Sequence, residues 1–154
     1  MTASTYLNAD RLFGGITRPA DDPAGRLAFA AQWLLGPGMM LLAGIMGAAR
    51  RGFHSDAIDG TRFPQAHTLE INLRYNTNTT EQLLLLAIIL PALAVTLPHH
   101  RLVLVPAIAA LFVFGRITFW IGYHYRPMAR TFGMALTAIP ILLSFSWLLV
   151  TALR

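Results

Sequence analysis

Four long stretches of the chain are almost continuously apolar, and polar segments separate them. They cover Leu27–Ala49, about Asn78–Leu97, Leu102–Tyr123 and Phe132–Leu153. An α-helix rises about 1.5 Å per residue, so roughly 20 apolar residues cross the hydrocarbon core of a bilayer, which is about 30 Å thick. Backbone polar groups in lipid must be satisfied within the segment that carries them, which favours helices. The pattern predicts an all-α integral membrane protein, folded as one four-helix bundle.

The second stretch is too short to span a membrane if only its apolar run is counted. That run covers Leu83 to Leu97, so the helix must begin earlier and draw Asn78 and Glu81 into the edge of the bilayer. Ionisable groups at that depth are costly and therefore mark candidate functional sites. A simpler interpretation remains open, in which Asn78 is the N-cap and Glu81 the third helical residue of a capping box.

The composition of the chain indicates how it is divided into domains. The chain of 154 residues is 55% hydrophobic and 12% charged, about half the charged fraction of a typical soluble domain. We expect one membrane domain over residues 27–154, with residues 1–26 as an irregular arm on the membrane surface, because they lack the basic start and apolar core of a signal peptide. The chain has no Cys, which excludes disulfides, thiolate metal sites and a cysteine nucleophile. The five histidines show no metal-ligand spacing, so no metal site is expected.

All twelve cationic residues are Arg. A basic chain can indicate nucleic-acid binding, but these arginines cluster at helix ends rather than along a soluble face, so nucleic acid is not an expected partner. Four spans would place the 50–77 loop and the 124–130 turn on one side with six arginines, against five on the other side. The positive-inside rule then slightly favours a cytoplasmic 50–77 loop. The absence of Lys favours a GC-rich genome and hence a bacterial inner membrane.

Two polar stripes carry the candidate chemistry. Arg74, Asn78 and Glu81 follow an i, i+4, i+7 spacing and share one helical face. Arg116 lies inside the third stretch, where a lone cation needs a partner. Measured from the arginine-rich side, Glu81 is roughly 10 Å deep and Arg116 roughly 14 Å deep. We therefore predict a Glu81–Arg116 ion pair, whose role would be structural if it only joins the two helices.

Further polar residues gather at the same side. Tyr123 lies two turns beyond Arg116, and Arg126 and Arg130 follow it; each has an ordinary alternative, as an interfacial aromatic or a snorkelling arginine. The combined set is more specific, because it predicts a binding site for a ligand with more than one carboxylate or phosphate. Its members are Arg50, Arg51, Arg74, Arg126 and Arg130, with Asn78, Glu81 and Tyr123 just inside them.

Three motifs resemble those of the MAPEG family, the membrane-associated proteins of eicosanoid and glutathione metabolism. They are Ala-Arg-Arg-Gly-Phe at 49–53, Arg74-x3-Asn78-x2-Glu81, and Gly115-Arg116-x6-Tyr123 followed by Arg130. The resemblance covers about Leu41 to Ala135. It implies a homotrimer of four-helix bundles, with glutathione sites between neighbouring subunits that open toward the cytoplasm.

The resemblance also implies a role for each residue. Arg50, Arg51 and Arg74 would hold the carboxylates of glutathione, and Arg126 belongs to the same cationic set. Asn78 and Glu81 would bind the backbone and amino group of the tripeptide. Tyr123 would contact the tripeptide near its cysteine. Arg130 would stabilise the thiolate, since a free thiol with a pKa of about 8.5 is mostly protonated at neutral pH. Arg130 and Tyr123 are thus the catalytic candidates.

The resemblance leaves alternative functions open. The first is a glutathione-dependent enzyme that conjugates glutathione to lipophilic electrophiles, reduces lipid hydroperoxides, or does both, with membrane lipids delivering the apolar substrate. The second is a non-catalytic ligand-binding protein or an accessory subunit of a larger membrane complex, since fold does not determine function. Two residues depart from the pattern of leukotriene C synthase: Phe119 and Gln82 stand where that enzyme has tyrosines. The Phe119 departure favours the second function, whereas the retention of Glu81 and Arg130 favours the first. A small transporter or channel is less favoured, because one buried ion pair offers no polar path across the bundle.

Overall fold

A computed structural model describes residues 11, 13, 15–53, 55, 58, 66–126 and 128–154. Among these residues it contains four long helices and no strands: α3 (Pro23–Ala49), α4 (His67–Thr96), α5 (Leu104–Tyr125) and α6 (Arg130–Ala152). Two short 3-10 helices, η1 (Arg50–Phe53) and η2 (His99–Arg101), follow α3 and α4. All four long helices are long and apolar enough to cross a membrane. The predicted all-α membrane fold is confirmed.

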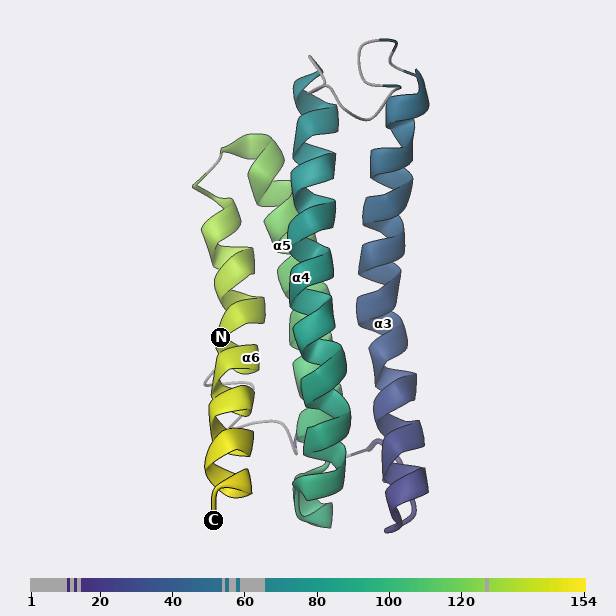
Figure 1. Ribbon diagram of the computed structural model, residues 1–154, viewed down its shortest axis with the longest axis vertical. Coiled ribbons are helices and arrows are strands. Elements are labelled where there is room, and N and C mark those ends of the chain that lie inside the picture. The colour runs from purple at the N-terminus through teal and green to yellow at the C-terminus, as the bar shows by residue number, and fades with distance from the viewer. Residues whose placement is uncertain are drawn as a thin grey trace.

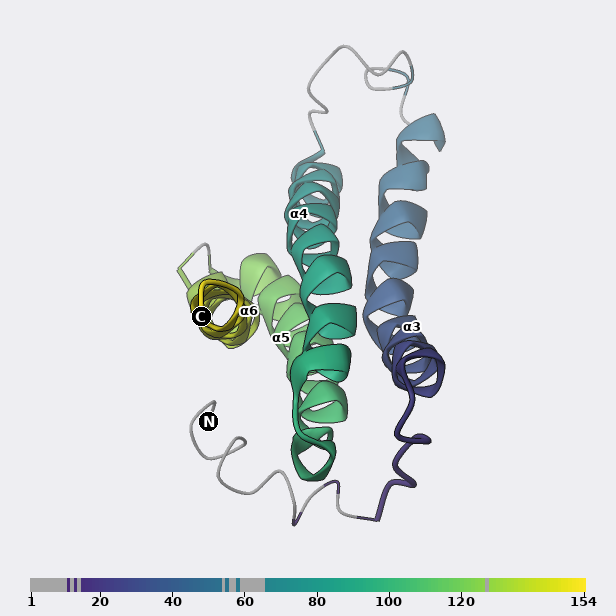
Figure 2. The same cartoon turned by 60° about the horizontal axis from the view of Figure 1, so that its bottom comes forward.

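The helices alternate in direction, so two of the three connections between them lie at one end of the bundle and the third lies at the other end (Figure 1). The lower end in that view holds the start of α3 and the segment between α4 and α5. The upper end holds η1, the start of α4 and the α5–α6 turn. α3 packs mainly against α4 and α5 mainly against α6, and α4 lies between α3 and α6 in both views (Figure 2). The chain is thus two helical hairpins packed side by side.

α4 begins earlier than its apolar run suggests. Its N-cap is Ala66, which makes no side-chain capping bond, and Asn78 lies well inside the helix. The capping-box interpretation of Asn78 and Glu81 is therefore wrong, and the expected 50–77 loop is shortened by η1 and by the first turns of α4. Its residues 54, 56–57 and 59–65 lie outside the described part of the chain. The 30 residues of α4 extend about 45 Å, so its upper turns continue past the α5–α6 turn (Figure 1).

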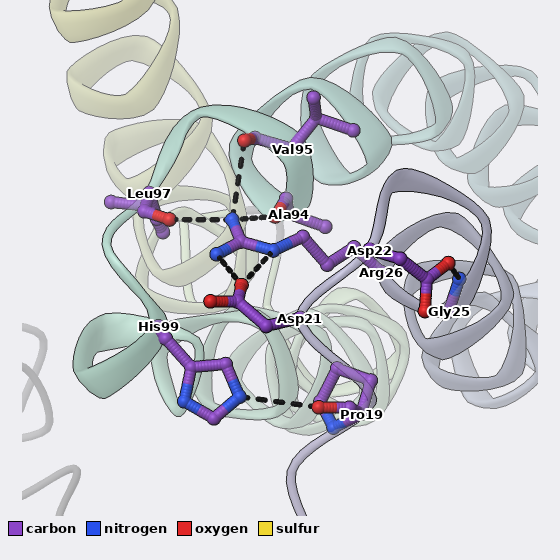
Figure 3. A network of polar contacts seen from close by, with 9 residues as sticks. All are labelled: Pro19, Asp21, Asp22, Gly25, Arg26, Ala94, Val95, Leu97 and His99. Carbon is purple, nitrogen blue, oxygen red and sulfur yellow. Dashed lines mark hydrogen bonds and ion pairs between the residues drawn. The ribbon is translucent and has the colours of Figure 1, made fainter.

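The segment before α3 is anchored to the lower end of the bundle (Figure 3). Asp22 caps α3 by accepting a hydrogen bond from the Gly25 N–H at 2.8 Å, and Pro23 occupies the first turn, so the helix begins inside the predicted 1–26 arm. Arg26 donates to the carbonyl oxygens of Ala94, Val95 and Leu97 at 3.0, 3.2 and 2.7 Å. These contacts satisfy carbonyls that the end of α4 would otherwise leave unpaired. We call this set of contacts the Arg26 clasp.

Two neighbouring side chains strengthen the Arg26 clasp. The Asp21 carboxylate accepts from Nε of Arg26 at 3.0 Å, and this hydrogen bond holds the pKa of Asp21 below its usual value of 3.8. A ring nitrogen of His99 lies 3.1 Å from the Pro19 carbonyl oxygen. The arm residues 19–22 are therefore fixed to the connection between α4 and α5; residues 1–10, 12 and 14 of the predicted arm lie outside the described residues.

α5 and α6 approach closely because small residues face each other. A Cβ added to Gly133 would lie 2.5 Å from the Gly115 carbonyl oxygen, and one added to Gly115 would lie 2.7 Å from Cγ2 of Thr137. Small residues at such positions let membrane helices pack backbone against backbone. This contact fixes the first turns of α6 against the last turns of α5, where the candidate site lies.

Candidate functional site

A hollow of about 370 Å³ opens in the upper half of the bundle, between α4, α5 and α6. We call it the α4–α6 hollow. It brings together five of the predicted site residues, from three different helices. Its lining consists of Leu73, Arg74, Thr77, Asn78, Glu81, Phe119, Tyr123, Arg130 and Met134. The i, i+4, i+7 stripe of α4 forms one wall, as its spacing predicted.

Arg74 stands at the mouth of the hollow with its side chain partly fixed. Its Nη2 lies 2.7 Å from Oε1 of Glu70, one turn earlier on α4, and its guanidinium also interacts with the Tyr123 hydroxyl. The side chain of Arg74 is 59% exposed, so it can still reach a ligand. The sequence prediction missed Glu70, although a Glu four residues before an Arg is a recognised stabilising pair on a helix. It was missed because α4 was expected to begin much later.

Arg130 lies directly above the ring of Tyr123. The Cζ atom of its guanidinium is 4.6 Å from the ring centroid, within cation–π range. Arg130 is also the first residue of α6, where the helix dipole is positive and a cation is disfavoured by about 0.3–1 kcal/mol. A cation at this position adds to the positive potential of the helix terminus, and together they favour an anion in the hollow.

Arg116 is fully buried. Its hydrogen-bond partners differ from the predicted partner, Glu81. Its Nη1 donates to Oδ1 of Asn78 at 2.7 Å and its Nη2 donates to Oγ1 of Thr137 at 2.6 Å. The predicted Glu81–Arg116 pair is not formed: the structure turns Asn78, three residues earlier on α4, toward Arg116 instead. Thr137 of α6 supplies the second acceptor, and no pattern in the sequence indicated which face of α6 would meet Arg116.

Glu81 is consequently left on the wall of the hollow. Its side chain is exposed, and within the described part of the chain it makes no hydrogen bond or ion pair. The two roles predicted for Glu81, pairing with Arg116 and binding a ligand amine, are therefore separated. Its carboxylate remains available to a cationic group of a ligand.

Three predicted members of the cationic set lie away from this hollow. Arg50 lines a different groove, between α3, α4 and α5, whose floor includes Asn72 and Trp120; there the Trp120 Nε1 donates to Oδ1 of Asn72 at 3.0 Å. Arg51 follows in η1, and Arg126 is the exposed C-cap residue of α5. Neither lines the hollow. Within one chain, Arg74 and Arg130 thus line the hollow, Arg50 lines the second groove, and Arg51 and Arg126 line neither.

The remaining lining residues set the chemical character of the α4–α6 hollow. Leu73, Phe119 and Met134 provide an apolar part beside the charged residues. Phe119 is buried there and offers no hydroxyl, as its sequence position indicated. Gln82, the second departure, is not part of the lining. The arrangement suits a ligand with several acceptor groups, one cationic group and an adjoining apolar part.

Comparisons with known proteins add a family and two relatives. The MAPEG family pattern matches residues 27–150. Transmembrane protein 79 of Mus musculus is 30% identical over 79 residues, and its Bos taurus counterpart is 29% identical over 79 residues. Each alignment takes in 51% of this chain and 20% of the relative, so about half of this chain aligns with about a fifth of each of these proteins. No solved structure matches the chain.

Proposed function

Since the chain belongs to the MAPEG family and is an integral membrane protein, we propose that it is a glutathione-dependent membrane enzyme. It would conjugate glutathione, through its sulfur, to lipophilic electrophiles, reduce lipid hydroperoxides, or do both. The α4–α6 hollow is the proposed glutathione site. One observation carries this proposal: Arg74, Asn78 and Arg130 face the same space as a carboxylate, Glu81, that has no partner in the described chain.

The charges of glutathione match those of the hollow. Glutathione carries two carboxylates and one ammonium group, joined by peptide carbonyls and amides. Arg74 offers a guanidinium group, which binds a carboxylate in a bidentate geometry, and Arg130 adds a second cation to the same space. Glu81 offers the complementary acceptor for the ammonium group. A phosphate ligand would leave Glu81 without a favourable partner, which is why a zwitterionic peptide is the better fit.

Arg130 is the residue proposed to activate the thiol. A thiol with a pKa of about 8.5 is mostly protonated at neutral pH, and a helix N-terminus or an adjacent Arg lowers that pKa. Arg130 combines both influences, because it is the first residue of α6. The guanidinium lies over the ring of Tyr123 and makes a cation–π contact with it. Tyr123 is therefore proposed to position Arg130 as well as to contact the ligand.

The chemistry then needs only the thiolate and its substrate. In conjugation, the sulfur bonds to the electrophilic carbon and the displaced electron pair leaves with the leaving group. In peroxide reduction, the sulfur takes the distal oxygen of the hydroperoxide, the O–O bond breaks, and the alkoxide is protonated to an alcohol. A second glutathione then converts the sulfenic acid to a disulfide and water. The apolar residues Phe119 and Met134 would receive the lipophilic substrate, which reaches the hollow laterally from the bilayer.

Arg50 supports a site shared between subunits. It lies in the groove between α3, α4 and α5 and therefore does not reach the α4–α6 hollow of its own chain. In the proposed homotrimer, Arg50 and Arg51 of one subunit would complete the carboxylate site of the next. Arg126, at the end of α5, would contribute to the rim. We place this end of the bundle at the cytoplasmic face, which is consistent with the arginine distribution.

A second candidate function is a non-catalytic glutathione- or lipid-binding protein. Phe119 favours it, because the apolar end of the hollow lacks the hydroxyl that leukotriene C synthase has there. The Arg130–Tyr123 arrangement favours the enzyme, since simple binding does not require a cation at the start of α6.

The test measures both binding and ionisation of the thiol. The purified protein in detergent would be titrated with glutathione by calorimetry, and the ultraviolet absorbance of the thiolate would be recorded for the wild type and for Arg130→Ala. Arg101→Ala, which removes an exposed cation of η2 at the opposite end, is the matched control. We expect a thiolate signal in the wild type and the control, and its loss in Arg130→Ala.

Three other results would change the conclusion. Absence of binding by the wild type would exclude the glutathione site. Binding without a thiolate signal would support the non-catalytic protein. A thiolate signal that survives Arg130→Ala would remove Arg130 from its assigned role.

A further inference from the structure

We propose that Arg116 is a positioning residue that fixes the side-chain amide of Asn78, so that Asn78 presents only its NH₂ group to the α4–α6 hollow. The ligand atom that meets Asn78 must then be an acceptor, a carboxylate or a carbonyl oxygen. This inference rests on the proposed function for the identity of the ligand, but the orientation of the amide follows from the protein alone.

The contact between Arg116 and Asn78 determines which end of the amide faces inward. A guanidinium can only donate hydrogen bonds, and Nη1 of Arg116 lies 2.7 Å from the amide of Asn78. The group that faces Arg116 must therefore be the oxygen, whichever way the amide is first assigned. The nitrogen points the other way, and Asn78 lines the hollow.

Arg116 is fully buried, is contacted from several sides and does not itself line the hollow. Thr137 accepts from its Nη2 at 2.6 Å and donates onward to the Met134 carbonyl at 3.0 Å. The rings of Phe119 and Phe112 lie 4.7 and 5.6 Å from its Cζ atom. Hydrogen bonds and cation–π contacts stabilise a cation whose burial would otherwise be costly.

The residue type at position 78 argues for a ligand-directed role. Arg116 is fully buried, and among the described residues it pairs with no carboxylate. If Asn78 served only to neutralise and hold Arg116, Asp would do so better, because it would add a charge-assisted bond. Asp, however, would turn an acceptor toward the hollow. Asn satisfies Arg116 and still offers a donor to the ligand.

The consequence is a fixed pattern of donors along the hollow. Asn78 joins Arg74 and Arg130 as a donor, while Glu81, one turn further along α4, is an acceptor. Residues three apart on a helix have Cβ atoms about 5–6 Å apart. A ligand that contacts both residues therefore needs an acceptor group for Asn78 and a cationic group for Glu81, separated by a similar distance. This requirement determines which end of the ligand points toward which end of α4.

The experiment compares Asn78→Asp with Asn78→Ala. Asp keeps the oxygen that faces Arg116 and removes the donor. We expect Asn78→Asp to melt at or above the wild-type temperature in the absence of ligand, and Asn78→Ala to melt below it. Both variants should bind glutathione about 10- to 100-fold more weakly, the usual effect of losing a donor to a charged acceptor.

A double-mutant cycle separates positioning from a merely structural role. Arg116→Met should weaken glutathione binding in the wild type but cause no further loss in the Asn78→Ala background, although it lowers the melting temperature in both. Arg116→Lys, which retains a donor, should restore part of the affinity. An equal loss of affinity in both backgrounds would overturn the positioning role.

Two further results distinguish this inference from the proposed function. If Asn78→Asp melts as low as Asn78→Ala, or binds glutathione as tightly as the wild type, the assigned amide orientation is wrong. If the wild type binds no glutathione but the order of melting temperatures holds, the proposed function fails while the amide orientation is supported.

Discussion

Replacing Gly133 with Ala tests how the site is held together. The added Cβ would lie 2.5 Å from the Gly115 carbonyl oxygen and would also contact the backbone of Phe119. An ordinary van der Waals contact begins near 3.4 Å, so α5 and α6 would have to separate by about 1 Å. Because the obstructing atoms belong to the backbone, no side-chain rotation can relieve the overlap. The cost should reach the upper part of the range for overpacked cores, about 2–3 kcal/mol.

Gly38→Ala is the matched control, because its expected effect on stability has the opposite sign. Nothing lies within 4 Å of a Cβ added to Gly38, in the middle of α3, so Gly38→Ala should be neutral or gain up to about 1 kcal/mol from helix propensity. The assay is thermal unfolding in detergent, followed by tryptophan fluorescence. For a chain of this size 1 kcal/mol corresponds to about 2–4 °C, so Gly133→Ala should melt roughly 4–12 °C lower. It should also weaken glutathione binding, because Arg130 would move from the Tyr123 ring. A Gly133→Ala protein as stable as the wild type would refute the close packing of α5 and α6.

Three other predictions concern the mouth of the hollow and the opposite end of the bundle. Glu70→Gln removes the ion pair with Arg74. It should change stability by less than about 1 kcal/mol but reduce glutathione affinity a few-fold, as measured by calorimetry. An unchanged affinity would show that the pair does not orient Arg74. Arg26→Gln removes donors to the Leu97 carbonyl and to the end of α4, so the protein should lose about 1–3 kcal/mol of stability while retaining wild-type glutathione affinity; a loss of affinity instead would contradict the separation of the two ends. The pKa of Asp21 is lowered by its hydrogen bond to Arg26, so its contribution to stability is complete above the ordinary value of 3.8 and is lost as the pH falls through the lowered value. The melting temperature should therefore decline below about pH 4, and the decline should be smaller in Asp21→Asn.

Periodicity was sufficient to predict the helices and one wall of the site. The apolar stretches gave all four spans, and the spacing of Arg74, Asn78 and Glu81 correctly placed them on one face. The start of α4 could not be predicted from hydropathy, because its upper turns lie beyond the apolar run.

Contacts between helices were harder to predict than positions along one helix. Depth alone made Glu81 a reasonable partner for Arg116, but the rotation of α4 selects Asn78. That rotation depends on packing, including the acceptor from Thr137, which lies far away in the sequence. The separation of Arg50 from the hollow likewise depends on how α3 packs, which a single sequence does not encode in any local pattern.

The division into two hairpins has a consequence for how the protein is made. The Arg26 clasp joins α3 to the end of α4, so the first hairpin is tied at the end opposite its connection before any residue of α5 is required. The second hairpin is held by its glycine contact. The α4–α6 hollow lies on the seam between them and is complete only after the hairpins dock. A ligand that binds in the hollow therefore selects the docked state of the two hairpins and stabilises it by mass action.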